Sequence, residues 1–250
     1  MIKEPFAIKN SWIHRINPCI RIVYAVLYSF VITLMQQFPT LLTALFISIF
    51  LVFLARLDLR EICKRLTIVF WFLIFVWIFL PITFGGEILY NAIFFNISNQ
   101  GVILSAQITL KTTAILFVFI SLITTMRIYT LGYALNNLKL SNKLVHLLLM
   151  TYRYIFVIEN EYRRILTAIK IRGFRSQTNI HSYKTYAYLI GMIFVRALIR
   201  AERVHQAMLC RGFKGKFYTL EKFDKQRKDY IFTLLSTISI SFLIILENCF

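Results

Sequence analysis

The sequence predicts an all-α polytopic membrane protein with about five transmembrane helices and long amphipathic helices on the cytoplasmic side. The first observation is composition, because 58% of the 250 residues are hydrophobic and the mean hydropathy is +0.68, whereas soluble domains have roughly 45–50% apolar residues. The second is a set of five long apolar runs. The third is an excess of 29 Lys and Arg over 11 Asp and Glu, gathered between particular runs. Together these observations exclude a disordered chain, a collagen and a soluble globular enzyme.

The five apolar runs are the predicted membrane spans. A bilayer core needs about 20 mostly apolar residues per helix, and local thinning of the bilayer accommodates shorter runs. Breaks separate the runs at Gln36–Thr40 and at Pro81 with the following Gly85-Gly86 pair. The predicted spans are Ile22–Gln36, Leu41–Ala55, Leu66–Ile82, Val102–Thr125 and Tyr230–Leu246.

The basic residues predict the orientation of these spans. Four precede the first span, four lie between the second and third, and twenty lie between the fourth and fifth. The turn at Gln36–Thr40, the Pro81–Gly101 segment and the C-terminal tail contain none. Because cytoplasmic loops carry the excess of Lys and Arg, we expect a cytoplasmic N-terminus and an external C-terminus. The expected regions are 1–125 with four spans, 126–229 in the cytoplasm and 230–250 with the last span.

Two further apolar stretches leave a seven-span alternative open. Leu144–Ile158 is interrupted by His146 and Arg153, and Tyr186–Ile199 is interrupted by Arg196. If both stretches crossed the bilayer, the termini would keep the same sides. We favour five spans, because both stretches are short for a bilayer core and each leads directly into a strongly cationic helix. They are better interpreted as partly buried helices at the cytoplasmic face.

Two long amphipathic helices are predicted between Met150 and Arg211. In each, apolar residues recur at alternating intervals of three and four, which places them in one stripe along the helix. Two helices lying on anionic lipid would show the same pattern. The first stripe is Ile155, Ile158, Tyr162, Ile165 and Ile169, and the second is Ile190, Phe194, Ala197, Ala201, Val204 and Met208. The opposite faces carry Glu159, Arg163, Arg164 and Lys170, and Arg196, Arg200 and Arg203.

An internal repeat links the ends of these two helices. Residues 168–175 match residues 207–214, and Arg164 matches Arg203 at the same offset of 39 positions. Each helix therefore ends in Arg-Gly-Phe. Glycine tolerates the left-handed conformation that commonly ends a helix, and Arg complements the negative end of the helix dipole. The pair could be two ordinary helix caps, or two guanidinium forks that dock into carboxylate-lined grooves, which implies two copies of a cytoplasmic partner.

The combined motifs are similar to those of the transmembrane T component of energy-coupling-factor importers, a group of ABC-type transporters, and most of all to the cobalt/nickel branch, the CbiQ family. The N-terminal segment 13–18 resembles the family's Leu-His-Arg-Leu-Asp-Pro entry. Residues 151–154 and 200–204 resemble its coupling segment. The two motifs usually written Ala-Arg-Gly appear here as Ile171-Arg172-Gly173 and Cys210-Arg211-Gly212, with the alanines replaced.

This resemblance implies a scaffold rather than a catalyst. In such importers two cytoplasmic ABC ATPases bind ATP and grip the coupling helices, and a separate membrane subunit binds the substrate, here expected to be cobalt or nickel, with cobalamin biosynthesis as one use. A vitamin remains an alternative cargo. The expected location is the cytoplasmic membrane of a bacterium or archaeon. Carried over from the family, the ATPase-coupling residues are Arg172, Gly173, Arg211 and Gly212, supported by Arg164, Ala168, Arg203 and Ala207.

Other candidate sites in the sequence are weaker. No P-loop is present, so we expect this chain to bind no ATP or other cofactor itself. The four histidines are scattered and the four cysteines lack metal-ligand spacing, so we expect no metal site. Lys111, within the fourth predicted span, is a functional candidate by its position but receives no role. A membrane enzyme acting on lipid or isoprenoid phosphates would need a carboxylate cluster that Asp58 and Glu61 do not make. Nucleic-acid binding is excluded, because the cations alternate with membrane spans.

Overall fold

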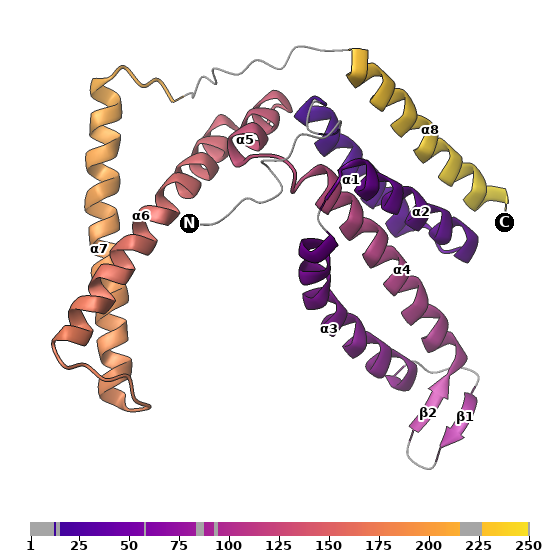
Figure 1. Ribbon diagram of the computed structural model, residues 1–250, viewed down its shortest axis with the longest axis horizontal. Helices are drawn as coiled ribbons and strands as arrows, with labels where there is room; N and C mark the ends of the chain where they lie inside the picture. Colours follow the sequence, from indigo (N-terminus) through magenta and orange to yellow (C-terminus); the bar gives the residue numbers. More distant parts are fainter. Residues whose placement is uncertain are drawn as a thin grey trace. The chain divides into compact units, whose positions relative to one another are not determined.

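The computed structural model describes residues 13, 16–57, 59–83, 88–92, 95–215 and 227–249 (Figure 1). The chain divides into two compact units. We call the described residues of 3–134 and 222–250 the membrane unit, and those of 135–221 the α6–α7 unit. The helices are α1 (Pro18–Leu34), α2 (Phe38–Leu54), α3 (Leu59–Thr83), α4 (Asn99–Leu122), α5 (Ile128–Asn137), α6 (Asn142–Ile171), α7 (Ile180–Cys210) and α8 (Arg227–Cys249).

The predicted helical membrane fold is confirmed, and each predicted span lies in one helix: α1, α2, α3, α4 and α8, with ends shifted by a few residues. Among the residues that the structure describes, three helical segments are long and apolar enough to cross a membrane, namely Ile62–Thr83, Asn99–Leu122 and Arg227–Cys249. Helices α1 and α2 are apolar but have 17 residues each, the lower limit for crossing a hydrocarbon core of about 30 Å. The chain is therefore a multi-pass membrane protein with spans of unequal length.

The segment between α3 and α4 differs from its prediction in one way. Pro81 lies inside α3, which ends at Thr83, one residue beyond the predicted end of the third span at Ile82. A proline is tolerated in a membrane helix where neighbouring groups compensate for its missing N–H. The difference is that β1 (Ile88–Ala92) and β2 (Phe95–Ser98) form an antiparallel pair in which Asn91 lies opposite Asn96. This short hairpin is absent from the sequence prediction, because its residues show no clear alternation of apolar and polar types.

Helix α4 is the centre of the membrane unit, since it packs against α1, α2 and α3 (Figure 1). Small residues at the contacts allow close approach of helices in lipid, and Ala44, Ser48 and Ala114 are all buried. The hydroxyl of Tyr28 in α1 donates to the carbonyl of Ala44 in α2 at 2.6 Å. On the outside, Phe53 is 81% exposed, as expected for a side chain in contact with lipid. The small, hydrogen-bonded residues thus lie inward and the large aromatic ones outward.

Polar contacts join three helices at the end of the unit where α1 begins. The Asn17 side chain caps α1 by accepting from the Cys19 N–H. The Asn17 N–H donates to the buried carboxylate of Asp229 in α8 at 2.8 Å. The buried guanidinium of Arg21 donates to the carbonyl of Leu122, the last residue of α4, at 2.5 Å. It also donates to the hydroxyl of Thr125, three residues after the end of α4. Because a buried charge without partners costs several kcal/mol, these contacts hold the three helix ends together.

A second polar group joins α4 and α8 to the turn between α1 and α2. The Lys111 ammonium donates to the carbonyl of Thr33 at 3.0 Å, and the Gln107 amide donates to the carbonyl of Gln36 at 2.7 Å. The carboxylate of Glu247 in α8 accepts from the N–H of Gln36 at 2.8 Å and from the hydroxyl of Thr40 at 2.7 Å. In the structure Lys111 thus has a hydrogen-bond acceptor at the end of α1, whereas the sequence assigned this residue no role.

Candidate functional site

The two predicted amphipathic helices are observed as α6 and α7, and both are longer than the prediction. They contain 30 and 31 residues, which corresponds to about 45 Å each. The stretches Leu144–Ile158 and Tyr186–Ile199 are continuous parts of these helices. Neither helix is among those apolar enough to cross a membrane. Within the described residues, the five-span interpretation therefore agrees with the helix composition better than the seven-span alternative does.

The first Arg-Gly-Phe segment ends α6 in a Schellman motif. Arg172 is the C-cap residue, and Gly173 follows with a φ of 84°. The Gly173 N–H donates to the carbonyl of Lys170 at 3.1 Å, and the Phe174 N–H donates to the carbonyl of Ile169 at 3.2 Å. These two reversed hydrogen bonds define the motif. A side chain with a Cβ is strained at this φ, so glycine is required here by backbone geometry.

The second Arg-Gly-Phe segment ends α7 in the same way. Arg211 is the C-cap residue, and Gly212 has a φ of 78°. The Gly212 N–H donates to the carbonyl of Leu209 at 2.9 Å, and the Phe213 N–H donates to the carbonyl of Met208 at 3.0 Å. The sequence repeat therefore corresponds to a repeat in backbone conformation, and each helix ends with one arginine at the last position before the chain turns.

The phenylalanine of each motif contacts the beginning of the other helix. The Phe174 ring meets the Tyr186 ring edge to face, with centroids 5.8 Å apart, and lies 6.4 Å from the His181 ring. The Phe213 ring lies 5.2 Å from the imidazole of His146 near the start of α6. The sequence shows that both phenylalanines are repeated but not what they contact. Each phenylalanine ring therefore packs an arginine-bearing turn against the first part of the neighbouring helix.

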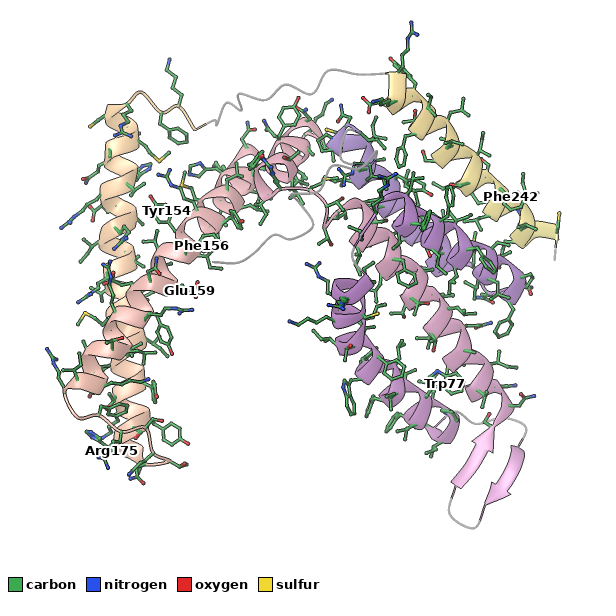
Figure 2. The ribbon with its side chains drawn as sticks, in the orientation of Figure 1. Trp77, Tyr154, Phe156, Glu159, Arg175 and Phe242 are labelled. Atoms are coloured by element: carbon green, nitrogen blue, oxygen red, sulfur yellow. The ribbon has the colours of Figure 1, made fainter. Side chains whose placement is uncertain are left out.

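The predicted site residues are all on the surface of the α6–α7 unit. The side chains of Arg172 and Arg211 are exposed, as are the two glycines that follow them. The supporting residues Arg164, Ala168, Arg203 and Ala207 are exposed as well. Arg175, in the segment between the two helices, is also exposed (Figure 2). The structure thus presents both arginine motifs outward, each on a turn that its own backbone hydrogen bonds define.

An apolar groove of about 700 Å³ separates parts of α6 and α7. The predicted stripe of α7 faces this groove through Ala197, Ala201, Val204 and Met208, and Ile155 and Ile158 contribute from α6. Tyr154 also lines the groove (Figure 2). Other members of the stripes are exposed: Tyr162, Ile190 and Phe194. The apolar surface therefore continues beyond the contact between the two helices.

Two arginines assigned to the polar face of α7 in fact bind α6. Arg196 forms a hydrogen-bonded ion pair with Glu161, and a guanidinium nitrogen of Arg200 lies 3.6 Å from the same carboxylate. The hydrogen bond from Arg196 is the largest effect that lowers the pKa of Glu161 below the usual glutamate value, and the charges of Arg200 and Arg164 lower it further. We call these three residues, Glu161, Arg196 and Arg200, the inter-helix clasp. Sequence reasoning missed this clasp, because helical periodicity places the arginines on a face without identifying what lies opposite.

Histidine, cysteine and carboxylate side chains do not gather in the described residues into a group of three or more that could hold a metal ion. Asp58 and Glu61, which entered the case for a membrane enzyme, have side chains outside the described part of the structure, and so does His14. Among the remaining histidines, His146 and His181 contact the phenylalanines of the two helix ends. The chemical character of the described site is therefore cationic and aromatic.

Comparison with known proteins identifies the family. The family model described as cobalt transport protein, CbiQ, matches residues 9–220. The chain is 28% identical over 218 residues to the energy-coupling factor transporter transmembrane protein EcfT of Listeria innocua, covering 82% of each chain. It is 29% identical over 217 residues to the EcfT protein of Staphylococcus aureus, covering 82% of this chain and 80% of the relative. The EcfT protein of Bacillus subtilis is 27% identical over 231 residues. The resemblance read from the motifs is confirmed, and the chain belongs to the CbiQ family of cobalt transport proteins.

Proposed function

We propose that this chain is the transmembrane energy-coupling component of an energy-coupling-factor importer. The relatives carry that function in their names and match the chain over most of its length. As a component of this kind, the chain is a non-catalytic membrane subunit, and ATP is hydrolysed by separate ATPase subunits. The observation that carries the proposal is the pair of identical Schellman motifs with exposed Arg172 and Arg211 at the ends of two long helices.

Each arginine motif supports docking to an ATPase subunit. A guanidinium offers several N–H donors in a planar fork that matches a carboxylate, and such charge-assisted hydrogen bonds are stronger than neutral ones. A fork at the tip of a rigid helix has a defined position, which lowers the cost of ordering it on binding. Two equivalent tips suit two ATPase subunits, one for each of Arg172 and Arg211. Movement of the ATPases would then be passed along α6 and α7 to the membrane helices.

The test reverses both charges together. We expect the Arg172→Glu/Arg211→Glu variant to insert into the membrane normally but to lose copurification with the ATPases and substrate uptake. The matched control is Lys139→Glu/Lys184→Glu, since both lysines are exposed on the same unit and lie outside the two Arg-Gly-Phe segments. The control should keep both properties. Undiminished uptake by the Arg172→Glu/Arg211→Glu variant would contradict the docking role.

We propose cobalt or nickel as the cargo of the complete importer, bound by a separate membrane subunit. The description of the matching family, cobalt transport protein, supports this choice, whereas the names of the EcfT relatives specify no cargo. A vitamin is the alternative. Cells that express the chain with its copurifying partners should accumulate radioactive cobalt or nickel in an ATP-dependent manner. Accumulation of a vitamin, with neither metal, would assign the chain to the vitamin branch.

We further propose that the N-terminus and the α6–α7 unit lie in the cytoplasm and that the C-terminus lies outside. The positions of the 29 basic residues relative to the spans support this orientation. ATPase docking requires the same side for Arg172 and Arg211. The proposed orientation rests on the distribution of basic residues, whereas the proposed docking rests on the two arginine motifs. Both place the α6–α7 unit in the cytoplasm.

A further inference from the structure

The repeat of 39 positions relates more than the two helix ends. Residues that line the groove from α6 have counterparts at this offset that line it from α7: Tyr154 corresponds to Ile193, Ile158 to Ala197, and Glu161 to Arg200. Each helix end also contacts the beginning of the other helix through its phenylalanine. The two helices are thus related by an approximate two-fold axis. Positions of α6 and α7 that correspond in the repeat lie opposite one another close to this axis.

Charge at the equivalent positions is reversed where the helices meet. Residues close to a two-fold axis meet their own counterparts, and identical charges there would repel. Here the counterparts are Glu161 and Arg200, and a guanidinium nitrogen of Arg200 lies 3.6 Å from a carboxylate oxygen of Glu161. Arg196 binds the same carboxylate. The Glu161 side chain is 16% exposed, whereas those of Arg196 and Arg200 are 50% and 44% exposed. The acid is therefore the more enclosed member of the clasp, and it is held from α7 by two cations.

The clasp lies well away from both arginine tips. Along the helices, Glu161 is about 16 Å from Arg172, and Arg196 is about 22 Å from Arg211, at 1.5 Å per residue. A change of roughly 10° in the crossing angle would move such a tip by on the order of 3 Å at these lengths. A shift of that size is enough to break a directional hydrogen bond. The separation of the two tips therefore depends on the angle at the clasp.

We propose that Glu161 is a positioning residue for energy coupling: through Arg196 and Arg200 it fixes the crossing of α6 and α7, so that the two arginine tips move as one body. This inference rests on the proposed coupling function. Glu161 itself is not placed in contact with an ATPase. Without the clasp, each tip still carries its complete docking motif, but motion at one tip is no longer passed to the other.

The structure offers a matched control within one turn of α6. Glu159 pairs with Arg163 on the same helix at 2.7 Å (Glu159 is labelled in Figure 2). Glu159→Gln thus removes an ion pair of similar geometry that does not join the two helices. Glu161→Gln keeps the size of the side chain while removing the charge. In the charge-swapped variant Glu161→Arg/Arg196→Glu/Arg200→Glu, one base on α6 faces two acids on α7, so each pair across the interface again joins opposite charges.

The experiment measures the distance between the tips and the transport rate in the same variants. Spin labels are placed on cysteines introduced at Ser176 and Lys214, both exposed, in a chain whose own cysteines are replaced by serine, because three of them are exposed. Pulsed electron paramagnetic resonance then reports the distance distribution in the assembled importer. We expect Glu161→Gln to broaden the distribution and lower ATP-driven uptake by about five- to tenfold. ATPase copurification should be retained. Glu159→Gln should match the unmodified protein, and Glu161→Arg/Arg196→Glu/Arg200→Glu should restore both the distance distribution and the uptake.

The inference is overturned if Glu161→Gln gives the same distances and uptake as Glu159→Gln, or if the charge-swapped variant does not recover. Failure of the proposed function has a different signature. In that case Arg172→Glu/Arg211→Glu still copurifies with the ATPases, while the distance measurement continues to report the state of the clasp. The two experiments therefore separate the positioning role of Glu161 from the docking role of the arginines.

Discussion

Gly101 allows the start of α4 to lie directly against the end of α3. A Cβ atom added at this position would lie 2.7 Å from the Cα of Pro81 and 2.9 Å from the carbonyl oxygen of Leu80. Real Cβ atoms do not approach backbone atoms so closely, so the two helices would have to separate. One glycine therefore determines how closely the two helices pack.

At this residue we predict that Gly101→Ala destabilises the membrane unit by about 1–3 kcal/mol, the usual cost of overpacking a close contact. Thermal unfolding of the purified protein in detergent measures the effect. Gly191→Ala in α7 is the control, because a Cβ there meets nothing within 4 Å. That change should be neutral or stabilising, since alanine favours a helix interior more than glycine does. Equal destabilisation by both changes would contradict the packing argument.

The glycines of the helix ends are required for a different reason. At Gly173 and Gly212 an added Cβ would meet no atom within 4 Å, but φ is positive at both. The constraint is backbone conformation rather than space. This explains why the two caps could be predicted from sequence, whereas the role of Gly101 could not: a helix end is a local signal, while a contact between two helices is not.

Between elements, Glu247 joins the end of α8 to the turn that connects α1 and α2. Its carboxylate accepts from the N–H groups of Gln36 and Gln37, at 2.8 and 3.4 Å, and from the hydroxyl of Thr40 at 2.7 Å. Nearby, Lys111 binds the carbonyl of Thr33, at the end of α1. Backbone groups of one turn are thus satisfied by side chains from two other helices. Four helices, α1, α2, α4 and α8, meet there.

For this junction we predict that Glu247→Ala lowers the free energy of unfolding by about 1–3 kcal/mol, because the backbone N–H groups of Gln36 and Gln37 lose their acceptor. Glu247→Gln, which retains one acceptor oxygen, should cost less. The exposed neighbour Asn248 supplies the control, Asn248→Ala. Denaturant or thermal unfolding in detergent compares the three variants. If Glu247→Ala and Asn248→Ala behave alike, Glu247 does not hold the turn.

For the molecule as a whole, the testable property is orientation in the membrane. The proposed topology places Cys63 and Cys210 in the cytoplasm and Cys249 outside. All three side chains are exposed in the structure, so burial within the chain does not prevent their labelling. A difference in reactivity would therefore report the side of the membrane.

Accordingly, we predict that a membrane-impermeant maleimide applied to intact cells labels Cys249 and spares Cys63 and Cys210. Variants with one cysteine each identify the site, and permeabilised cells should allow all three to be labelled. The seven-span alternative also leaves Cys210 in the cytoplasm and Cys249 outside, so these cysteines test orientation. A cysteine introduced at the exposed Ser176, which seven spans would place outside, tests the number of spans. Labelling of Cys210 from outside would overturn the proposed topology.

Most of the helices, the two caps and the unequal charge of the loops could be predicted from the sequence alone. These features depend on local periodicity, on the conformational preference of glycine and on composition within one segment. The short hairpin was not predicted, since neither of its strands has a strong pattern of its own.

Only the tertiary structure decided what the singled-out residues contact. Lys111 was an isolated charge in the sequence and is part of a junction in the fold. Arg196 and Arg200 were part of a polar face and prove to hold Glu161 across a helix interface. The sequence itself determined that two helices end in the same arginine-bearing turn, because each cap is encoded within a few consecutive residues. The clasp between those helices joins residues 35 or more positions apart, and such pairs come together only when the chain has folded.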